Sequence, residues 1–315
     1  MPIGARRSVL AGLAAGALFS PSLVRAQTVA PLPLAPVIPP STLAIDPSAA
    51  SVVAASADYA DRMTVPVRLN GQGPFPFVID TGSNRTVISD VLALQLNLPM
   101  MNAMQVHAAT GIVSTGSVRV ANLNVGNRWM RDFDAPVLQA KNLGALGMLG
   151  IDAVASQRIV LDFRHKRMNI VPSHQPDDDA GAIVVRARSK YGQLLLVDSW
   201  VEGIPIYVII DTGGEVSIAN TVLRTTLAKR RSGYPNPVVV TSVTGDTVAA
   251  DLSFLPKVKL GNILVSNLQV AYADMYAFRQ FGLDAKPAML LGMDTLRRFD
   301  RVSVDFPGRE VRFLL

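Results

Sequence analysis

Apolar residues of this chain occur in short runs between glycine and asparagine turns, and the same succession of runs appears twice. Each copy begins with two strand-like runs joined by a turn, continues with a short helical segment and paired strands, and closes with two alternating strands. Short strands, tight turns and little helix are typical of β-barrel folds. The ordered repetition predicts an all-β protein with an internal duplication and two similar lobes.

The two copies correspond element by element. The first copy predicts strands, a helical segment and closing strands at Met63–Leu69, the run into Asp80, Ser89–Leu96, Ile159–Phe163 and Arg167–Val171. The second copy predicts the corresponding elements at Gly192–Val201, the run into Asp211, Asn220–Lys229, Val302–Phe306 and Glu310–Leu314. Each copy also has an apolar run that ends in Gly-x-Asp, at Met148–Asp152 and Leu290–Asp294.

One short motif stands out in both copies. Phe77–Ser83 has the sequence FVIDTGS, and Val208–Gly214 has the sequence VIIDTGG. A single Asp-Thr-Gly is a weak signal, because all three are common turn residues. Two copies, each behind a buried-strand pattern and each in its own half of the chain, indicate that the halves meet through Asp80 and Asp211. Two carboxylates at one site can carry out general acid–base hydrolysis.

The chain divides into four predicted segments. Residues 1–26 combine Arg6-Arg7, an apolar run and a small-residue cleavage pattern, which is typical of an export signal. The run is too short to span a bilayer, which needs about 20 residues. The paired arginines are compatible with twin-arginine export and with an ordinary signal. Residues 27–57 form a Pro/Ala-rich linker or pro-segment, and a charged connector separates a first lobe, 58–174, from a second lobe, 182–315.

Composition narrows the classes of function. The chain has no cysteine, which excludes a thiol nucleophile, a Cys-ligated metal and disulfides. Its formal charge of +6 falls to +3 if Arg6, Arg7 and Arg25 leave with the signal. The densest basic run, Lys229–Arg231, is shorter than the basic stripe of nucleic-acid-binding proteins. We therefore expect no nucleic-acid partner, a periplasmic or secreted location, and no membrane segment in the mature chain.

The paired motifs resemble those of the pepsin and retropepsin aspartic proteases. In that family Asp-Thr-Gly follows an apolar strand, and a downstream apolar-apolar-Gly segment threads a ψ-shaped loop beneath the active-site turn. The resemblance covers about residues 60 to 315, and it implies a two-lobed, retropepsin-like fold in a single chain with a cleft between the lobes. It also implies an aspartic endopeptidase that acts as a monomer on extended polypeptide, with no metal and no cofactor.

The resemblance assigns the catalytic roles to Asp80 and Asp211, which share one proton and activate a water molecule. Supporting roles fall on the residues that follow each aspartate: Thr81, Gly82 and Ser83 in the first lobe, and Thr212, Gly213 and Gly214 in the second. The threonines are expected to join the two turns, and the glycines to avoid a Cβ clash. Ser83 is expected to hydrogen-bond Asp80 and favour its charged form. Gly214 has no hydroxyl, which predicts an asymmetric pair.

A cover over the cleft is expected from two hairpins. Candidate flap residues are His107, Ala109, Thr110 and Gly111 in the first lobe, and Thr244 and Gly245 in the second. Neither hairpin has the tyrosine of pepsin-like flaps or the dense glycines of viral ones, so the sequence leaves specificity open. An extended peptide would be bound mainly through its backbone, in the manner of an added strand.

Other interpretations remain at this point. A catalytically silent, two-lobed peptide-binding module would keep the same fold. An actin-like ATPase also has an Asp-x-Gly turn in each of two lobes, but it needs longer α/β lobes. The three histidines have no metal-ligand spacing, and no Gly-x-Ser-x-Gly elbow is present. Asp152 and Asp294 are interpreted as caps of a following segment or as loop braces rather than as further catalytic acids.

Overall fold

The computed structural model describes residues 51–54, 56–57, 63–108, 111–126, 128–176, 181–228 and 236–315. The predicted export signal and the predicted linker up to residue 50 lie outside these ranges. The end of the predicted linker forms two short strands, β1 (Ser51–Ala54) and β2 (Ser56–Ala57). They pair with β11 and β3 of the folded lobes. Such pairing covers a sheet edge that would otherwise stay open.

The first lobe is built on an eight-stranded sheet in the order β2-β3-β4-β9-β5-β8-β7-β6, and a further pairing of β3 with β7 bends it into a ring. The bounds are β3 Met63–Leu69, β4 Gln72–Ile79, β5 Val87–Ser89, β6 Met100–His107, β7 Ile112–Val125, β8 Arg128–Leu138 and β9 Gly147–Leu149.

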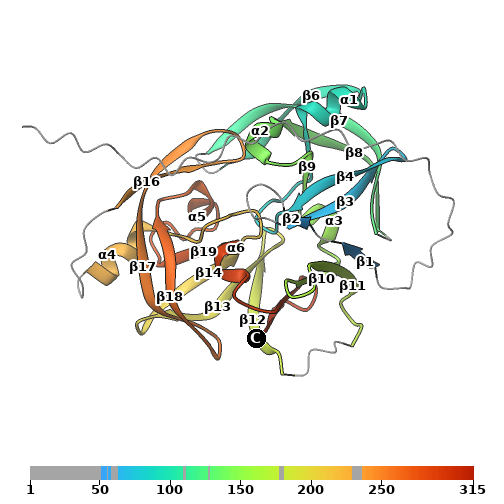
Figure 1. Ribbon diagram of the computed structural model, residues 1–315. Coiled ribbons are helices and arrows are strands. Elements are labelled where there is room, and N and C mark those ends of the chain that lie inside the picture. Colours follow the sequence, from blue (N-terminus) through green and yellow to red (C-terminus); the bar gives the residue numbers. More distant parts are fainter. Residues whose placement is uncertain are drawn as a thin grey trace, which may run out of the picture.

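The second sheet has thirteen strands in the order β1-β11-β10-β20-β21-β12-β13-β14-β19-β15-β18-β17-β16, and a β13–β17 pairing closes its second-lobe part into a ring. The bounds are β10 Gln157–Asp162, β11 Arg167–Pro172, β12 Ile183–Lys190, β13 Gln193–Val201, β14 Ile204–Ile210, β15 Ile218–Ala219, β16 Pro237–Thr241, β17 Thr247–Leu260, β18 Ile263–Tyr272, β19 Ala288–Leu291, β20 Arg301–Asp305 and β21 Glu310–Leu314. The predicted β-rich, two-lobed architecture is confirmed (Figure 1).

Helices are short throughout the described ranges: α1 Asp90–Gln95, α2 Ala140–Leu143, α3 Ile151–Val154, α4 Thr221–Ala228, α5 Tyr276–Gln280 and α6 Met293–Leu296. The sequence pattern predicts α1 and α4. It misses the other four, because four or five residues are too few to show a helical period. Where the structure describes the chain, no helix combines the length and the apolar character needed to cross a membrane.

The closing strands of the two lobes pair with each other. β10 runs antiparallel to β20 in a symmetric register, in which Arg158 lies opposite Asp305 and Asp162 lies opposite Arg301. Apolar side chains of both lobes belong to one buried cluster, which includes Ile159 and Val304. The lobes therefore share a sheet and a core.

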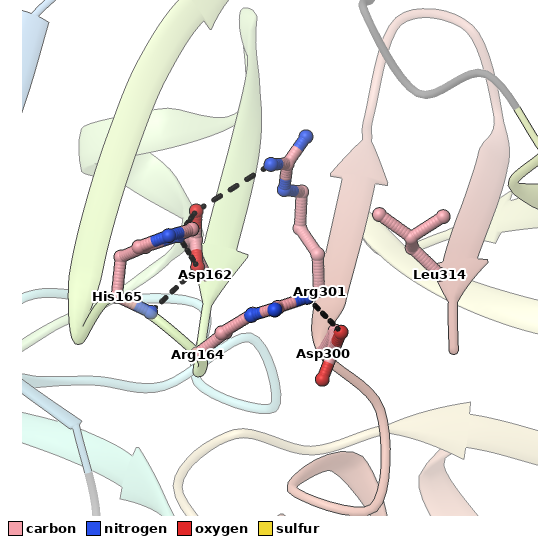
Figure 2. Close-up of a pocket in the computed structure, with 6 residues that line it drawn as sticks. All are labelled: Asp162, Arg164, His165, Asp300, Arg301 and Leu314. Atoms are coloured by element: carbon pink, nitrogen blue, oxygen red, sulfur yellow. Dashed lines mark hydrogen bonds and ion pairs between the residues drawn. The ribbon is translucent and has the colours of Figure 1, made fainter.

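Asp162 is a largely buried carboxylate at this junction. It accepts hydrogen bonds from the backbone amide and the ring Nδ1–H of His165, and Arg301 Nη2 lies 3.5 Å from it. Figure 2 shows Asp162 between these two side chains, with the exposed Arg164–Asp300 pair beside them. Burial raises the pKa of Asp162, but the bonds and charge of His165 and the charge of Arg301 outweigh burial and hold the pKa below 3.8.

Replacing Asp162 by Asn should lower the free energy of unfolding at pH 7 by about 1–3 kcal/mol, because a buried charged acceptor is lost. A depressed folded pKa means that this stabilisation is present above the unfolded pKa of 3.8 and is lost as the pH falls through the lower folded pKa. Denaturant unfolding at a series of pH values measures both effects.

The matched control is Asp300→Asn, which removes an exposed ion pair with Arg164 and should cost less than about 1 kcal/mol. This account of the junction would be contradicted if the free energy of unfolding of Asp162→Asn differed from that of the unmodified protein by the same amount at every acid pH.

Candidate active site

Each Asp-Thr-Gly turn follows a buried strand that ends at a matched place in its lobe. β4 leads into Asp80 and β14 leads into Asp211. Both aspartates are anchored through their backbones, since Asp80 N–H donates to Leu149 O at 2.9 Å and Asp211 N–H donates to Leu291 O at 3.0 Å. The two sequence motifs therefore have matching structures in the two lobes.

In each lobe, a strand from later in the chain pairs with the strands before and after the Asp-Thr-Gly turn. β9 lies between β4 and β5, parallel to the first and antiparallel to the second. β19 lies in the same way between β14 and β15. This is the ψ-shaped arrangement that the resemblance to the aspartic proteases implies. The returning chain therefore lies in the same sheet as the strand that leads to the aspartate.

Asp152 and Asp294 brace these loops, as the sequence indicates. Asp152 accepts hydrogen bonds from Thr86 N–H at 2.9 Å and Thr86 Oγ1 at 2.7 Å. Asp294 accepts the same pair of bonds from Ser217. Burial raises the pKa of Asp152, while the bonds from Thr86 and the charge of Arg85 oppose the rise. Sequence reasoning did not single out the two hydroxyl residues, although each stands six positions after its aspartate.

Close packing explains the glycine of each Gly-x-Asp motif. Thr86 Oγ1 accepts from Gly150 N–H at 3.2 Å, and Ser217 Oγ accepts from Gly292 N–H at 3.1 Å. A Cβ on Gly150 would lie 2.4 Å from the carbonyl carbon of Arg85. Only glycine lets the returning chain approach the active-site turn this closely.

Thr81 and Thr212 join the two turns by reciprocal hydrogen bonds. Thr81 N–H donates to Thr212 Oγ1 at 3.0 Å, and Thr212 N–H donates to Thr81 Oγ1 at 3.2 Å. Each hydroxyl also donates to the opposite strand, Thr81 to Ile210 O at 2.9 Å and Thr212 to Ile79 O at 2.8 Å. Both threonines are buried, at 3% and 1% exposure. The predicted link between the turns is present.

The two carboxylates face the same small space. A Cβ built on Gly82 would lie 2.8 Å from Asp211 Oδ1 and 3.0 Å from Asp80 Oδ1. A Cβ on Gly213 would lie 2.3 Å from the carboxyl carbon of Asp80. Each glycine is thus required by the approach of the carboxylate from the other lobe. The structure brings together Asp80 and Asp211, which the sequence places about 130 positions apart.

Backbone amides also hold the carboxylates. Gly82 N–H donates to Asp80 Oδ1 at 2.7 Å. Gly213 N–H and Gly214 N–H donate to Asp211 Oδ1 at 3.1 and 3.2 Å. Hydrogen bonds from amides stabilise the ionised form of a carboxyl group.

The prediction for Ser83 is wrong. Its hydroxyl donates to Arg85 O at 2.9 Å and not to Asp80. Serine hydroxyls commonly bond to a backbone group two residues away, and that local partner competes with a more distant one. The Ser83 hydroxyl therefore does not supply the expected hydrogen bond that would stabilise ionised Asp80. The two turns still differ in sequence, with Ser83 in the first and Gly214 in the second.

The first predicted cover hairpin, β6–β7, reaches the second lobe. His107, at the end of β6, has its ring centroid 5.6 Å from that of Tyr276 on α5. Gly111 lies in the turn, where its carbonyl accepts from Ala108 N–H at 2.7 Å. The predicted flap residues 109 and 110 lie outside the described ranges.

The second hairpin, β16–β17, reaches the first lobe in the matching way. Thr244 and Gly245 lie in its turn, and Val243 packs against a first-lobe apolar cluster that contains Leu143 of α2. A Cβ on Gly245 would lie 2.6 Å from Asn142 Nδ2. Figure 1 shows this orange hairpin extending over the green α2. Because α2 and α5 occupy matching places in the two copies, the hairpins make pseudo-symmetric contacts. Nothing in the sequence pattern singles out Tyr276 or Asn142.

Replacing Thr81 by Val should destabilise the protein by about 1–3 kcal/mol, because buried Ile210 O and Thr212 N–H lose their partner. Thr81→Ser keeps the hydroxyl and should cost clearly less. Thermal unfolding of the two variants under identical conditions measures the difference. A larger loss for Thr81→Ser than for Thr81→Val would show that packing of the methyl group, and not the hydrogen bonds, holds the turns together.

Comparison with known families agrees with this geometry. A family model described as aspartyl protease matches residues 65–153 and 197–295, one segment in each lobe. The two segments contain both Asp-Thr-Gly turns and both Gly-x-Asp loops. A search of curated proteins found no match.

Proposed function

The chain belongs to the aspartyl protease family, and from that membership we propose that it is an aspartic endopeptidase with Asp80 and Asp211 as its catalytic pair. The observation that carries the proposal is the position of the two carboxylates. Each lies against the active-site glycine of the other lobe, and reciprocal threonine bonds hold the two turns together.

Two carboxyl groups on one site cannot both ionise without repulsion, so they share a proton, an effect for which aspartic proteases are the standard example. In the proposed reaction the ionised carboxylate takes a proton from a bound water molecule. The water oxygen attacks the carbonyl carbon of the peptide, and the protonated carboxyl group donates to the carbonyl oxygen. Proton transfer to the amide nitrogen then lets the C–N bond break. Apparent pKa values belong to the pair and not to either residue alone.

The proposed substrate is an extended polypeptide that lies beneath the two hairpins. His107 on β6–β7 and Val243 on β16–β17 each contact the opposite lobe, so a substrate must pass under or displace them. Closure of such a cover excludes water and completes the grip on the substrate. The substrate backbone would pair as an added strand, with pockets for alternate side chains. Export to the periplasm or the cell exterior is also part of the proposal, and it rests on residues 1–26.

Cleavage of casein, an unfolded protein, tests the proposal. Assays from about pH 3 to 8 should show activity of the unmodified protein and a loss of at least about 10³-fold in both Asp80→Asn and Asp211→Asn, because each substitution removes one of the two proton-transferring groups. Asp284→Asn, at an exposed loop position, is the matched control and should keep full activity.

Activity that survives both active-site substitutions would place catalysis elsewhere. If the unmodified protein cleaves nothing across the range but binds casein, the chain is a catalytically silent peptide-binding module and the proposed activity is wrong.

A further inference from the structure

A buried glutamine of the second lobe contacts the active-site turn of the first lobe. Gln193 is the first residue of β13 and is 4% exposed. Its Nε2–H donates to Gly82 O. Gly82 is the residue whose missing Cβ leaves room for both carboxylates. The contact therefore crosses from one lobe to the catalytic turn of the other.

A tight hairpin turn places this glutamine. Lys190 and Gln193 pair at the end of β12–β13, and Tyr191 and Gly192 between them have φ of 54° and 86°. Positive φ at both central residues is typical of a two-residue hairpin. A Cβ on Gly192 would lie 2.5 Å from Ile151 Cδ1, so the turn lies directly on the first lobe.

The turn is also fixed to its own lobe. Lys190 Nζ donates to Phe281 O, and the rings of Tyr191 and Phe281 pack edge to face with centroids 5.9 Å apart. Contacts of the hairpin turn with both lobes thus fix the position of Gln193.

Gly82, whose carbonyl accepts from Gln193, also contacts the Asp80 carboxylate. Gly82 N–H donates to Asp80 Oδ1 at 2.7 Å. The peptide on its other side joins Gly82 to Ser83, whose N–H donates to Asp80 O at 3.3 Å. Glycine has more backbone freedom than any other residue. A donor that fixes Gly82 O limits rotation of the Gly82–Ser83 peptide, and this keeps the Ser83 amide on the Asp80 carbonyl. The turn in which Gly82 N–H faces the Asp80 carboxylate is thereby held in shape.

We propose that Gln193 is a positioning residue for the first-lobe active-site turn, acting on Asp80 through Gly82 without touching substrate. The inference rests on the proposed peptidase activity. It gives the second lobe two roles: it supplies Asp211, and it sets the geometry of Asp80.

Two substitutions test the proposal. Gln193→Met keeps the length of the side chain but has no donor, and kcat should fall by about 10- to 100-fold while KM changes by less than about 3-fold. Gln193→Glu can donate only when its carboxyl group is protonated. Its activity should approach that of the unmodified protein at acid pH and fall, relative to it, as the glutamate ionises. Gln72→Met, at an exposed strand end, is the control and should match the unmodified protein.

A purely structural role for Gln193 would lower the melting temperature without this change in pH profile. A kcat for Gln193→Met within about 2-fold of the unmodified value, or a Gln193→Glu profile parallel to it, overturns the inference. If Gln193→Met does not fold, the pH profile of Gln193→Glu still decides. An unmodified protein that hydrolyses no peptide would refute the proposed function itself, and the inference with it.

Discussion

The reciprocal hydrogen bonds between Thr81 and Thr212 are the interaction on which the rest of this structure depends. Each threonine uses both its amide and its hydroxyl to reach the other lobe. Buried amides and carbonyls need partners, so neither turn is satisfied without the other. The same bonds bring the two Asp-Thr-Gly turns close enough for their carboxylates to share one space. Fold stability and the candidate chemistry therefore depend on one contact.

The wider scaffold keeps that contact in place. β10 and β20 pair across the lobes, and a common apolar cluster extends through both. Each ψ-shaped loop anchors its aspartate from below through Leu149 O or Leu291 O. Local turns, lobe interiors and the lobe junction all support the same arrangement at the centre, which is the consistency expected of a sequence that specifies one structure.

Much of the fold could be predicted from the sequence, because strand period and duplication are local signals. Met63–Leu69 and Glu310–Leu314 are strands with the predicted bounds, and the Gly-x-Asp motifs brace their loops as expected. Contacts between lobes left no such signal. Gln193 and Gly82 are 111 positions apart, and the pairing of His107 with Tyr276 depends on where two lobes meet. The prediction for Ser83 is wrong for a different reason, because its hydroxyl donates to the nearby carbonyl of Arg85.

The two halves are alike in architecture and differ at the site. The first turn carries Ser83 where the second carries Gly214, and Gly214 N–H donates to Asp211 Oδ1. The Gln193 contact comes from the second lobe to the first. A duplicated scaffold that differs in the surroundings of its two acids can give them different roles, since environment sets the protonation of each of two neighbouring carboxyl groups.

A double-mutant cycle on hydrolysis of one defined peptide tests most directly whether Asp80 and Asp211 form a single catalytic unit. kcat/KM is measured for the unmodified protein, Asp80→Asn, Asp211→Asn and the double variant. Residues that act as a unit give strongly non-additive losses, so the double variant should be about as slow as either single one. Losses that multiply in the double variant would mean that the two aspartates act independently, and would contradict a shared site.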